Sequence, residues 1–568
     1  MCSIVGIHQP TADPCASATA KAMLEETAHR GPDACGTASV GWQARADAPS
    51  GLRVAPRGLP WAMGHARLAI TGTLGDQPMP GSGPDGLRFV VGVNGEIWNW
   101  AALRRREAGG ARLRQDSDSL VVPLVLSRHL EEEGAGDEGV LSAVSRTAEE
   151  LDGEFAFAYM DGTRTVLCRD PFGVKPLYYA ARAGTVAFSS ERKALWALGL
   201  EAVRVPPNSA VLLSPGRVAT RGRSAVMPPE PRPFASRQAA KAGYGRALAR
   251  AVGKRVRGHK QVGVVFSGGV DSALIAGAVG RTDTQPVCIV AGREGSPDVE
   301  AARGAADAMG LTLVVARLDA GGVAEALPAL LRAVEERNQL HVETALPLYF
   351  VAKEARRRGL RVLLTGQAAD ELFAGYAWYP RILQEEGEAA LRARMDDDRD
   401  MLHAECLERE DKVTMAHSVE LRVPYLDPLV VRAAARIPIS YQVSPGDPLG
   451  KRLHRELAAS WGLPHEVAWR VKVAAQHGSG SRALLARASR SAGPVPSGYD
   501  AVRSVGERMG SNQRYGHRYM PDAEAWDLDG PIQWALDQLW HREGLGGPEG
   551  RAALAADLEA LSAEGALA

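Results

Sequence analysis

The pattern of apolar and polar positions changes character near residue 215. Before it, short β-type runs such as RFVVGVNGEI (88–97) and EFAFAYMD (154–161) are separated by turns rich in glycine, proline and aspartate. From about residue 239 to 485, apolar runs such as QVGVVF (261–266) and RVLLTG (361–366) alternate with helical stretches. This alternation is typical of parallel strands joined by helices, so we expect a doubly wound α/β sheet in the second region.

The two regions are separated by VMPPEPRPFASRQ (226–238), whose proline and arginine content indicates an exposed linker. The last residues, RAALAADLEALSAEGALA (551–568), favour a helix. We therefore divide the chain into four parts: a β-rich domain, a linker, an α/β domain and a C-terminal extension of unassigned role, at residues 1–215, 216–238, 239–485 and 486–568.

Composition excludes several classes of protein. Lys+Arg and Asp+Glu both number 67, so net charge predicts neither a nucleic-acid nor a membrane partner. No apolar run approaches the roughly 18–20 residues that span a bilayer, and MCSIVGIHQP has no secretory pattern. The six cysteines form no CxxC pair, so neither a zinc site nor a disulfide framework is predicted. We expect a cytoplasmic protein, and a homodimer stays open.

Cys2 directly follows the initiator methionine. Removal of Met1 would place a free α-amino group, with an ordinary pKa of about 7.7–8.0, beside a thiol of pKa about 8.5. The amine can accept the thiol proton near neutral pH, so one residue supplies both nucleophile and base. A lone cysteine at position 2 is more often simply buried, and the surrounding motifs decide between these interpretations.

Those motifs follow in order along the first region: AHRGPD (28–33), HARLAI (65–70), VNGEIWN (93–99), DSDS (116–119), LDGEFAFAYMD (151–161), RDPFGVKPLYY (169–179) and FSSERKAL (188–195). The set resembles the glutaminase domain of class II glutamine amidotransferases, in the version found in asparagine synthetases. The resemblance implies an Ntn-type αββα sandwich that hydrolyses glutamine at Cys2.

Hydrolysis of a carboxamide produces an oxyanion that needs hydrogen-bond donors. By the resemblance, Asn94 and the Gly95 backbone N–H supply them. Arg67 would hold the α-carboxylate of glutamine through a two-pronged hydrogen bond, while Glu96 and Asp118 would hold its α-ammonium group.

A second motif, SGGVDS (267–272), lies between an apolar strand and a helix start. It lacks the lysine of a Walker loop and the spacing of the dinucleotide fingerprint. It resembles the pyrophosphate-binding loop of ATP pyrophosphatases, in which backbone N–H groups and hydroxyls wrap phosphates at a helix N-terminus. ATP contacts are therefore expected along the whole loop, at Ser267, Gly268, Gly269, Val270, Asp271 and Ser272.

The segment LLTGQAADELFAGYAWY (363–379) resembles the second nucleotide loop of asparagine synthetases. Thr365 and Gly366 would contact ATP, and Asp271, Asp370 and Glu371 would hold Mg²⁺. Carboxyl ends of parallel strands share one edge of a sheet, so both loops can face one pocket.

Two further stretches match family signatures, EDKVTMAHSVELRVPYLD (410–427) and AWRVKVAAQHGSG (468–480). Lys472 is the candidate to neutralise charge on the α-phosphate. Arg422 either pairs with a local acid or contacts substrate.

Some positions depart from the common bacterial pattern. Gln367 stands where those asparagine synthetases carry glutamate, and glutamine cannot take up a proton. Glu343 lies in the region that binds aspartate in the family and would repel a carboxylate unless neutralised. Ser296 and Asp298, in REGSPD (293–298), are further candidates near nucleotide and acceptor.

Together these features predict a glutamine-hydrolysing asparagine synthetase that uses ATP and Mg²⁺, with glutamine, ATP and aspartate or another carboxylate as substrates. Adenylation would activate the acid, and an internal tunnel would carry ammonia to it. One alternative is an amidating or ring-closing ligase of specialised metabolism that acts on another carboxylate. A non-catalytic sensor on the same fold is the other.

Overall fold

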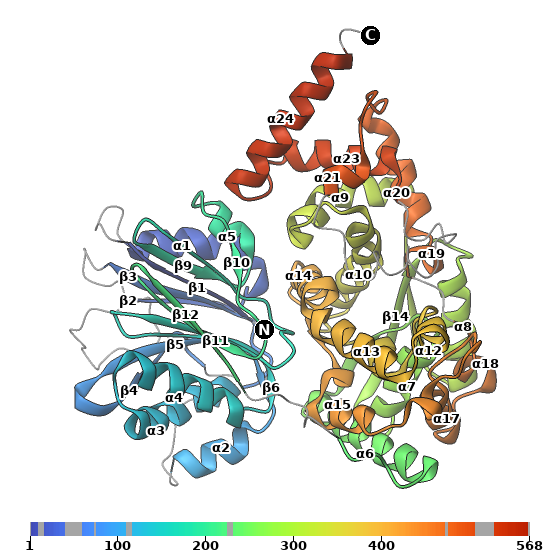
Figure 1. The fold of residues 1–568 in the computed structure, drawn as a ribbon, viewed down its shortest axis with the longest axis horizontal. Helices are drawn as coiled ribbons and strands as arrows, with labels where there is room; N and C mark the ends of the chain where they lie inside the picture. Colours follow the sequence, from blue (N-terminus) through green and yellow to red (C-terminus); the bar gives the residue numbers. More distant parts are fainter. Residues whose placement is uncertain are drawn as a thin grey trace. The chain divides into compact units, whose positions relative to one another are not determined.

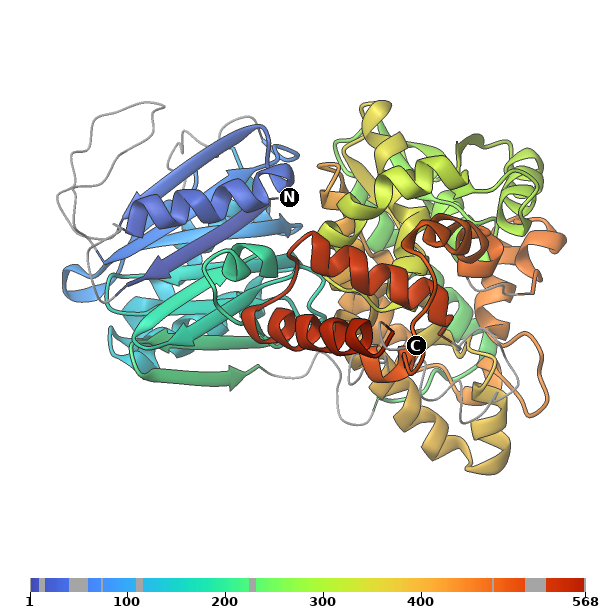
Figure 2. The ribbon, with the colours of Figure 1, turned by 90° about the horizontal axis from the view of Figure 1, so that it is seen from above.

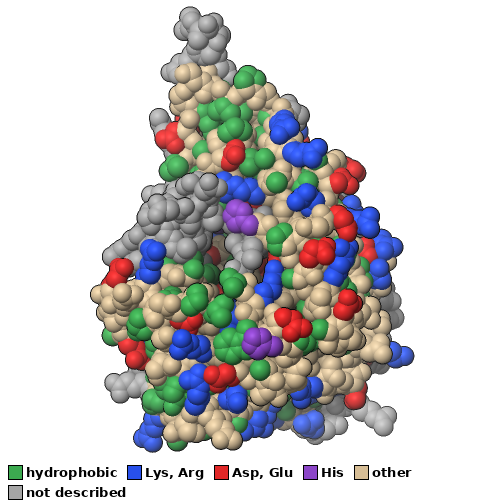
Figure 3. Space-filling model, turned by 90° about the vertical axis from the view of Figure 1, so that its right-hand side faces the viewer, with side chains coloured by type: hydrophobic (Ala, Val, Ile, Leu, Met, Phe, Trp, Pro, Cys, Tyr) green, Lys and Arg blue, Asp and Glu red, His purple; other side chains and the backbone are tan. Residues whose placement is uncertain are grey.

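The computed structural model describes residues 2–9, 16–39, 60–72, 75–108, 116–223, 231–471, 475–505 and 528–565. The chain forms two compact units: Met1–Ala225 with Gly546–Gly550, and Val226–Leu545 with Arg551–Ala568. Within the described ranges, no helix is long and apolar enough to cross a membrane. On the face drawn in Figure 3, Lys and Arg side chains are interspersed with Asp and Glu.

The first unit contains two antiparallel six-stranded sheets. The first sheet has the order β10-β8-β9-β1-β3-β2, formed by Val203–Arg204, Tyr178–Arg182, Thr185–Ser189, Cys2–His8, Trp61–Arg67 and Ala34–Ser39. The second has the order β12-β11-β7-β6-β5-β4, formed by Arg217–Gly222, Ser209–Ser214, Thr165–Arg169, Gly153–Met160, Arg88–Ile97 and Met79–Ser82.

Alternation of side chains along the strands creates four layers. In β1, Ile4 joins the apolar core between the sheets, whereas Val5 and Ile7 pack with α1 (Ala16–Thr27) on the outer face. The strands β5 and β6 place their other faces against α3 (Val121–Glu133) and α4 (Asp137–Glu150). Figure 1 shows α1 and the α3–α4 pair on opposite outer sides, and Figure 2, from above, shows α1 lying across the strands. The expected αββα sandwich is confirmed.

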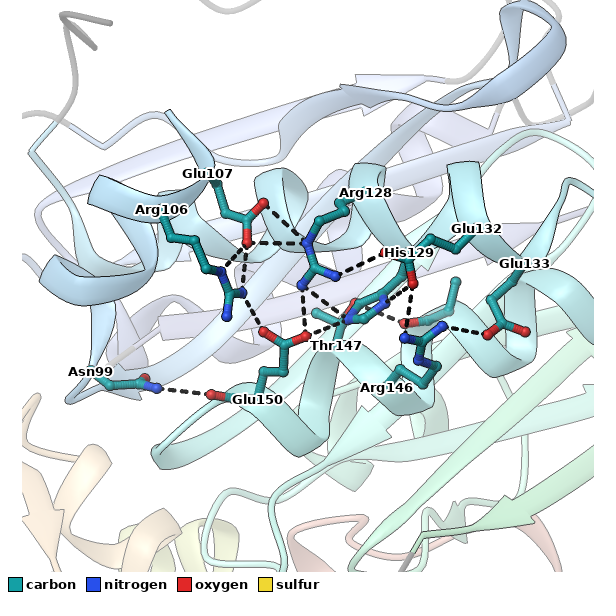
Figure 4. Close-up of polar contacts among 11 residues, drawn as sticks. Asn99, Arg106, Glu107, Arg128, His129, Glu132, Glu133, Arg146, Thr147 and Glu150 are labelled. Atoms are coloured by element: carbon teal, nitrogen blue, oxygen red, sulfur yellow. Dashed lines mark hydrogen bonds and ion pairs between the residues drawn. The ribbon is translucent and has the colours of Figure 1, made fainter. Parts of the chain in front are cut away.

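An ion-pair network joins α2 (Trp100–Glu107), α3 and α4 on the outside of this unit (Figure 4). Arg128 contacts Glu107 at 3.2 Å and Glu150 at 2.6 Å. Arg106 also pairs with Glu150, and the buried ring of His129 lies 2.8 Å from the same carboxylate. Glu150 of α4 is therefore the common partner of charged side chains from α2 and α3.

The second unit is built on a parallel sheet of order β15-β14-β13-β16-β17. Its strands are Thr312–Arg317, Gln285–Gly292, Gln261–Val265, Val362–Leu364 and Glu420–Arg422. The order reverses between β13 and β16, which confirms the expected doubly wound sheet. Ligand sites in such sheets form outside the carboxyl ends of the strands at this reversal.

Helices of the second unit connect and cover the strands. They include α6 (Arg237–Val256), α7 (Val270–Val279), α8 (Pro297–Met309), α9 (Ala320–Val334), α10 (Gln339–Arg357), α11 (Ala369–Phe373), α14 (Glu408–Met415), α15 (Pro428–Ala435), α17 (Arg452–Ser460), α20 (Ser481–Ser489) and α23 (Gly530–Arg542). The final apolar–acidic stretch forms α24 (Pro548–Gly565), as its composition favours.

The C-terminal extension packs on the second unit through buried polar groups. Asp537 of α23 pairs with Arg337, and the Tyr499 hydroxyl donates to the same carboxylate over 2.7 Å. The Gln339 backbone N–H donates to Gln533 Oε1 over 2.9 Å. The extension thus holds the start of α10 in place through these hydrogen bonds and the ion pair.

Candidate active sites

The first candidate site surrounds Cys2 at the start of β1. Cys2 is 6% exposed and pairs in register with Arg67 at the end of β3. Its backbone nitrogen, which becomes the α-amino group once Met1 is removed, donates to Asn94 Oδ1 over 3.0 Å. The candidate nucleophile, its candidate base and Asn94 therefore lie together.

Asn94 is fully buried on β5, and its Nδ2 has no hydrogen-bond partner among the described residues. A buried donor without a partner costs roughly 1–3 kcal/mol, so a native structure rarely keeps one without a reason. The neighbouring Gly95 admits no side chain, because a Cβ there would lie 2.2 Å from the Glu154 carbonyl oxygen. An unpaired side-chain amide donor, Asn94 Nδ2, beside the backbone of a glycine is the arrangement that stabilises an oxyanion.

The surroundings of the Cys2 thiol favour its protonated form. Burial raises its pKa, and the nearby Asp118 carboxylate adds to the rise. The backbone N–H of Leu68 and the Arg67 guanidinium offset part of this shift. A thiol of raised pKa needs a base, and the amino group on the same residue is the adjacent one.

The three candidate glutamine-binding residues line the same end of the sandwich. Arg67 donates to the Gly72 carbonyl over 3.1 Å. Glu96 is buried and accepts a hydrogen bond from Thr71. Asp118 is buried and accepts from the Ile97 N–H over 2.8 Å. Arg67 and Asp118 both act on the Cys2 thiol, so the structure brings them to the candidate nucleophile.

The sequence did not assign roles to the residues that hold the chain terminus in place. Arg30 is completely buried; its Nε donates to the Cys2 carbonyl over 3.1 Å, and it pairs with Glu191 at 2.7 Å. Lys193 contacts the same carboxylate at 2.5 Å. The available signal was the charged residues within the motifs AHRGPD and FSSERKAL.

The second candidate site lies at the reversal of the parallel sheet. The loop after β13 holds Ser267, Gly268 and Gly269, and α7 begins at Val270. Gly268 has φ +70°, and a Cβ there would lie 2.4 Å from the Ala301 backbone, so this turn requires glycine. Ser272 Oγ donates to the Gly269 carbonyl over 3.1 Å, which holds the loop against the helix start.

The loop after β16 packs directly on the first. A Cβ on Gly366 would lie 3.0 Å from Asp271 Cβ and 3.2 Å from the Ser272 nitrogen. Thr365 is buried, and its N–H donates to the Arg422 carbonyl over 3.1 Å. The structure therefore brings together the two sequence motifs, which lie about a hundred residues apart.

Lys451, which the sequence did not single out, bridges two of the three candidate metal ligands. Its Nζ lies 2.7 Å from Asp271 Oδ2 and 2.7 Å from Asp370 Oδ1. The buried His454 contributes Nε2 at 3.1 Å from Asp271 Oδ1. Burial alone would lower the pKa of Lys451, but the two carboxylates outweigh it and raise that pKa. Lys451 is a permanent cation at this position.

The backbone around this triad is strained. Lys451, Ala368 and Ala374 all have positive φ, at +53°, +73° and +56°. Residues without glycine's freedom persist in this region only where the surroundings demand it, and they cluster at functional sites. Gly375 permits the contact, since a Cβ there would lie 2.1 Å from both Asp370 Oδ1 and the Lys451 side chain.

The donor set fits Mg²⁺ only in part. Asp271 and Asp370 converge on one point and offer the hard carboxylate oxygens that Mg²⁺ prefers. Glu371 is buried and accepts from the Tyr376 hydroxyl over 2.5 Å. The described residues contain no cluster of three or more acidic, histidine or cysteine side chains suited to a metal. Two carboxylates suit an ion that takes its remaining ligands from phosphates and water.

Gln367 contacts a carboxylate that the sequence did not assign. Its Nε2 donates to Glu410 Oε1, on α14. Burial raises the pKa of Glu410 to about 6. The charged run EREDK (408–412) was the available signal, and in the structure all five of its side chains are buried or nearly so.

The REGSPD loop is linked through Arg470 to the loop after β13, the candidate phosphate-binding loop. Arg470 donates to the Ser267 carbonyl over 2.9 Å and contacts Asp298 at 3.1 Å. Ser296 is fully buried, and its hydroxyl has no partner among the described residues. Lys472, the predicted cation for the α-phosphate, lies outside the described residues.

Two ambiguous residues prove to be internal. Arg422 is 1% exposed and pairs with Glu420 at 2.8 Å, which is the first of its two alternatives. Glu343 is fully buried, accepts from Gln339 Nε2 over 2.6 Å and lies 3.9 Å from Arg482. Burial raises the pKa of Glu343 to about 7, so more than half of this carboxyl is neutral below that pH.

Comparisons with known proteins agree with this architecture. The family "Asparagine synthase" matches residues 243–405 and 383–493, and "Glutamine amidotransferase domain" matches residues 1–211. A putative glutamine-hydrolysing asparagine synthetase from Methanocaldococcus jannaschii is 34% identical over 480 residues, covering 76% of this chain and 85% of the relative. A putative glutamine-hydrolysing asparagine synthetase of Mycobacterium bovis is 28% identical over 565 residues, covering 77% and 81%.

Among solved structures, glutamine PRPP amidotransferase from B. subtilis covers 55% of this chain and 65% of its own at 19% identity, with a TM-score of 0.34. Because both the identity and the TM-score are low, nothing about the two candidate sites is inferred from that structure. The identity and coverage of the curated relatives, together with the two family matches, place the chain in the asparagine synthetase family of glutamine-hydrolysing, ATP-dependent ligases.

Proposed function

We propose that this chain is a glutamine-dependent asparagine synthetase: it adenylates aspartate with ATP and amidates the product with ammonia from glutamine, releasing glutamate, AMP and pyrophosphate. The observation that carries the proposal is the pairing of two sites in one chain. One holds Cys2 against the spare amide of Asn94, and the other holds Asp271 and Asp370 around one point at the switch of a parallel sheet.

In the first unit, the Cys2 amino group takes the thiol proton and the thiolate attacks the glutamine carboxamide. The oxyanion that forms accepts hydrogen bonds from Asn94 Nδ2 and the Gly95 N–H. Arg67 orients the substrate carboxylate, while Glu96 and Asp118 orient its ammonium group. This proposal gives a use to the buried donor of Asn94, which is otherwise left unsatisfied.

In the second unit, Ser267–Ser272 with Thr365 and Gly366 hold the triphosphate at the N-terminus of α7. Mg²⁺ held by Asp271, Asp370 and Glu371 would neutralise phosphate charge. Lys451 keeps the first two of these carboxylates together, and Lys472 balances the charge on the α-phosphate. We propose the functional limits 1–215, 216–238, 239–485 and 486–568, with β12 (Arg217–Gly222) extending the sheet of the first unit into the 216–238 segment, and with ammonia made in the first unit used in the second.

The direct test is product analysis. Incubation with glutamine, ATP, Mg²⁺ and aspartate should yield asparagine, glutamate, AMP and pyrophosphate in equal amounts. Cys2→Ala should abolish glutamate release and retain synthesis from added ammonia. Formation of ADP and phosphate would overturn the adenylation step, and no asparagine from either nitrogen source would overturn aspartate as the acceptor.

One observation favours a second candidate, an amidotransferase that acts on another carboxylate. Gln367 and its partner Glu410 replace the glutamate that the common bacterial enzymes carry at this loop. A panel of carboxylic acids screened by pyrophosphate release separates the two. Aspartate as the best acceptor supports the first proposal, whereas a strong response to another acid supports the second.

A further inference from the structure

A basic groove lies in the second unit, and none of its described lining residues belongs to either candidate site. It runs between α6 and α15, which contact each other (Figure 1), and has a volume of about 420 Å³. Five arginines line it: Arg232, Arg246, Arg250, Arg432 and Arg436. No acidic side chain is among its described lining residues.

The arginines come in matched pairs on the two helices. Arg246 and Arg250 are four residues apart on α6, while Arg432 and Arg436 frame the end of α15 with the same spacing. Residues four apart on a helix are neighbours, and like charges in that relationship repel. Arg246, Arg250 and Arg432 form no ion pair within the described part of the chain. The arginines of each pair therefore repel each other, and a bound anion between them would offset this repulsion.

The floor between these pairs is apolar. Ala247 and Ala433 are almost fully buried there, and Phe234 closes one side. The guanidinium of Arg436 lies 4.2 Å from the Phe234 ring centroid, and its Nε donates to the Arg232 carbonyl over 2.9 Å. The Phe234 N–H returns a hydrogen bond to the Arg436 carbonyl over 3.1 Å. These contacts hold the end of the groove in a fixed shape.

From this arrangement we propose that the groove between α6 and α15 binds an organic phosphate, a small molecule with at least two phosphate charges and a flat or apolar portion. Guanidinium groups bind phosphate oxygens through two parallel hydrogen bonds, and four of them on two helices can surround a diphosphate. The apolar floor takes the remainder of the ligand. The confined volume and the balanced charge of the whole chain, 67 against 67, favour a small ligand over a nucleic acid.

This site differs from the proposed ATP pocket in a way that an experiment can use. The groove offers no carboxylate to hold a metal, so its ligand binds without Mg²⁺. GDP is a suitable probe, with a purine and two phosphates. Titration calorimetry of the full chain with GDP in EDTA at low salt should show one bound nucleotide, weaker as salt rises because the charges are exposed. GDP should bind more tightly than pyrophosphate, which lacks the apolar portion.

Arg246→Glu and Arg432→Glu should each weaken GDP at least about tenfold, the size expected for losing a charge-assisted pair. Lys241→Glu is the matched control, because it changes the charge equally on α6 but does not line the groove. It should leave GDP affinity within about twofold. Arg246→Lys keeps the positive charge but loses the planar guanidinium that makes two parallel hydrogen bonds. Its GDP affinity should lie between those of Lys241→Glu and Arg246→Glu. All these side chains lie at the surface, and thermal melting confirms that the variants are folded.

Unchanged GDP binding in both Arg→Glu variants would overturn the proposal, as would an equal loss in Lys241→Glu. Tighter binding of an acidic peptide or an RNA oligonucleotide than of GDP would overturn the assignment to a small organic phosphate. Because the readout is binding in EDTA, it is independent of asparagine synthesis, and the two proposals can fail separately.

Discussion

Gln367 Nε2 donates a hydrogen bond to Glu410 Oε1, which joins the loop after β16 to α14. By the resemblance of this loop to that of asparagine synthetases, Gln367 stands where their common bacterial versions carry glutamate, and it cannot take up a proton. Glu410 can, because burial raises its pKa to about 6, so that it is mostly ionised at neutral pH. The carboxylate missing from the loop is thus present one hydrogen bond away.

We predict that Glu410→Gln lowers ammonia-dependent amidation by about 100-fold, the lower range for loss of a general base, and leaves glutamine hydrolysis unchanged. In the wild type, the rate of amidation should rise with pH through about 6 as Glu410 ionises. The variant should lose this limb. The measurement is the pH profile of kcat/KM for the acceptor, and an unaltered profile would exclude Glu410 as the base.

Lys451 supplies a second prediction, because it is the cation that separates Asp271 from Asp370. Lys451→Met leaves two partly exposed carboxylates facing each other without their buried cation, and removal of one partner from a buried ion pair costs at most about 3–5 kcal/mol. Mg²⁺ can take the place of the ammonium group. The melting temperature of the variant should therefore rise on addition of Mg²⁺ by more than that of the wild type.

Lys412→Met is the matched control for this experiment. Lys412 is equally buried and pairs with Glu335 at 2.9 Å, but lies outside the nucleotide loops. It should be destabilised to a similar extent and gain nothing extra from Mg²⁺. Equal rescue of both variants would argue against a metal position between Asp271 and Asp370.

Asn94 gives the third prediction. Asn94→Ala removes the unsatisfied donor and should lower kcat for glutamine hydrolysis by about 10²–10³, as loss of one oxyanion donor does. Synthesis from added ammonia should remain. Asn99→Ala is the control, because both polar atoms of Asn99 are used internally, with the Glu150 carbonyl and the Asp152 N–H. A comparable loss in Asn99→Ala would assign Asn94 a structural role.

The sequence predicted the architecture well because the signals were periodic or local. Alternation in RFVVGVNGEI and EFAFAYMD produced paired strands, and SGGVDS produced a strand, turn and helix. Residues that act through long-range contacts were missed. Lys451 lies 180 positions from Asp271, and Glu410 lies 43 from Gln367. Nothing near either residue in sequence shows which loop it faces, because that depends on the packing of the helices.

Glu343 yields a prediction about stability. Burial raises its pKa to about 7, whereas in the unfolded chain it titrates near 4.5. The unfolded state releases its proton first, so the free energy of unfolding falls as pH rises from about 4.5 to 7 and then levels off. Glu343→Gln cannot ionise, so it should gain at most about 3 kcal/mol over the wild type between pH 4 and pH 8. Chemical denaturation at both values measures this difference, and a pH-independent difference would contradict the buried, neutral carboxyl.

Glu150 predicts the opposite dependence on pH. Burial alone would raise its pKa, but hydrogen bonds and charge from Arg128 and Arg106 outweigh this effect and lower it to about 2. The stabilisation is fully present above about pH 4.5, where the unfolded chain also ionises, and is lost as pH falls toward 2. Glu150→Gln should therefore lower the free energy of unfolding at pH 7 by about 0.2–1 kcal/mol, the range for partly exposed pairs. The deficit should shrink toward zero near pH 2, and high salt should reduce it at pH 7 because the network is open to solvent.

Glu138→Gln is the control for this prediction, because its carboxylate is exposed on α4 and lies 3.7 Å from Arg217. It should change the free energy of unfolding much less than Glu150→Gln at either pH.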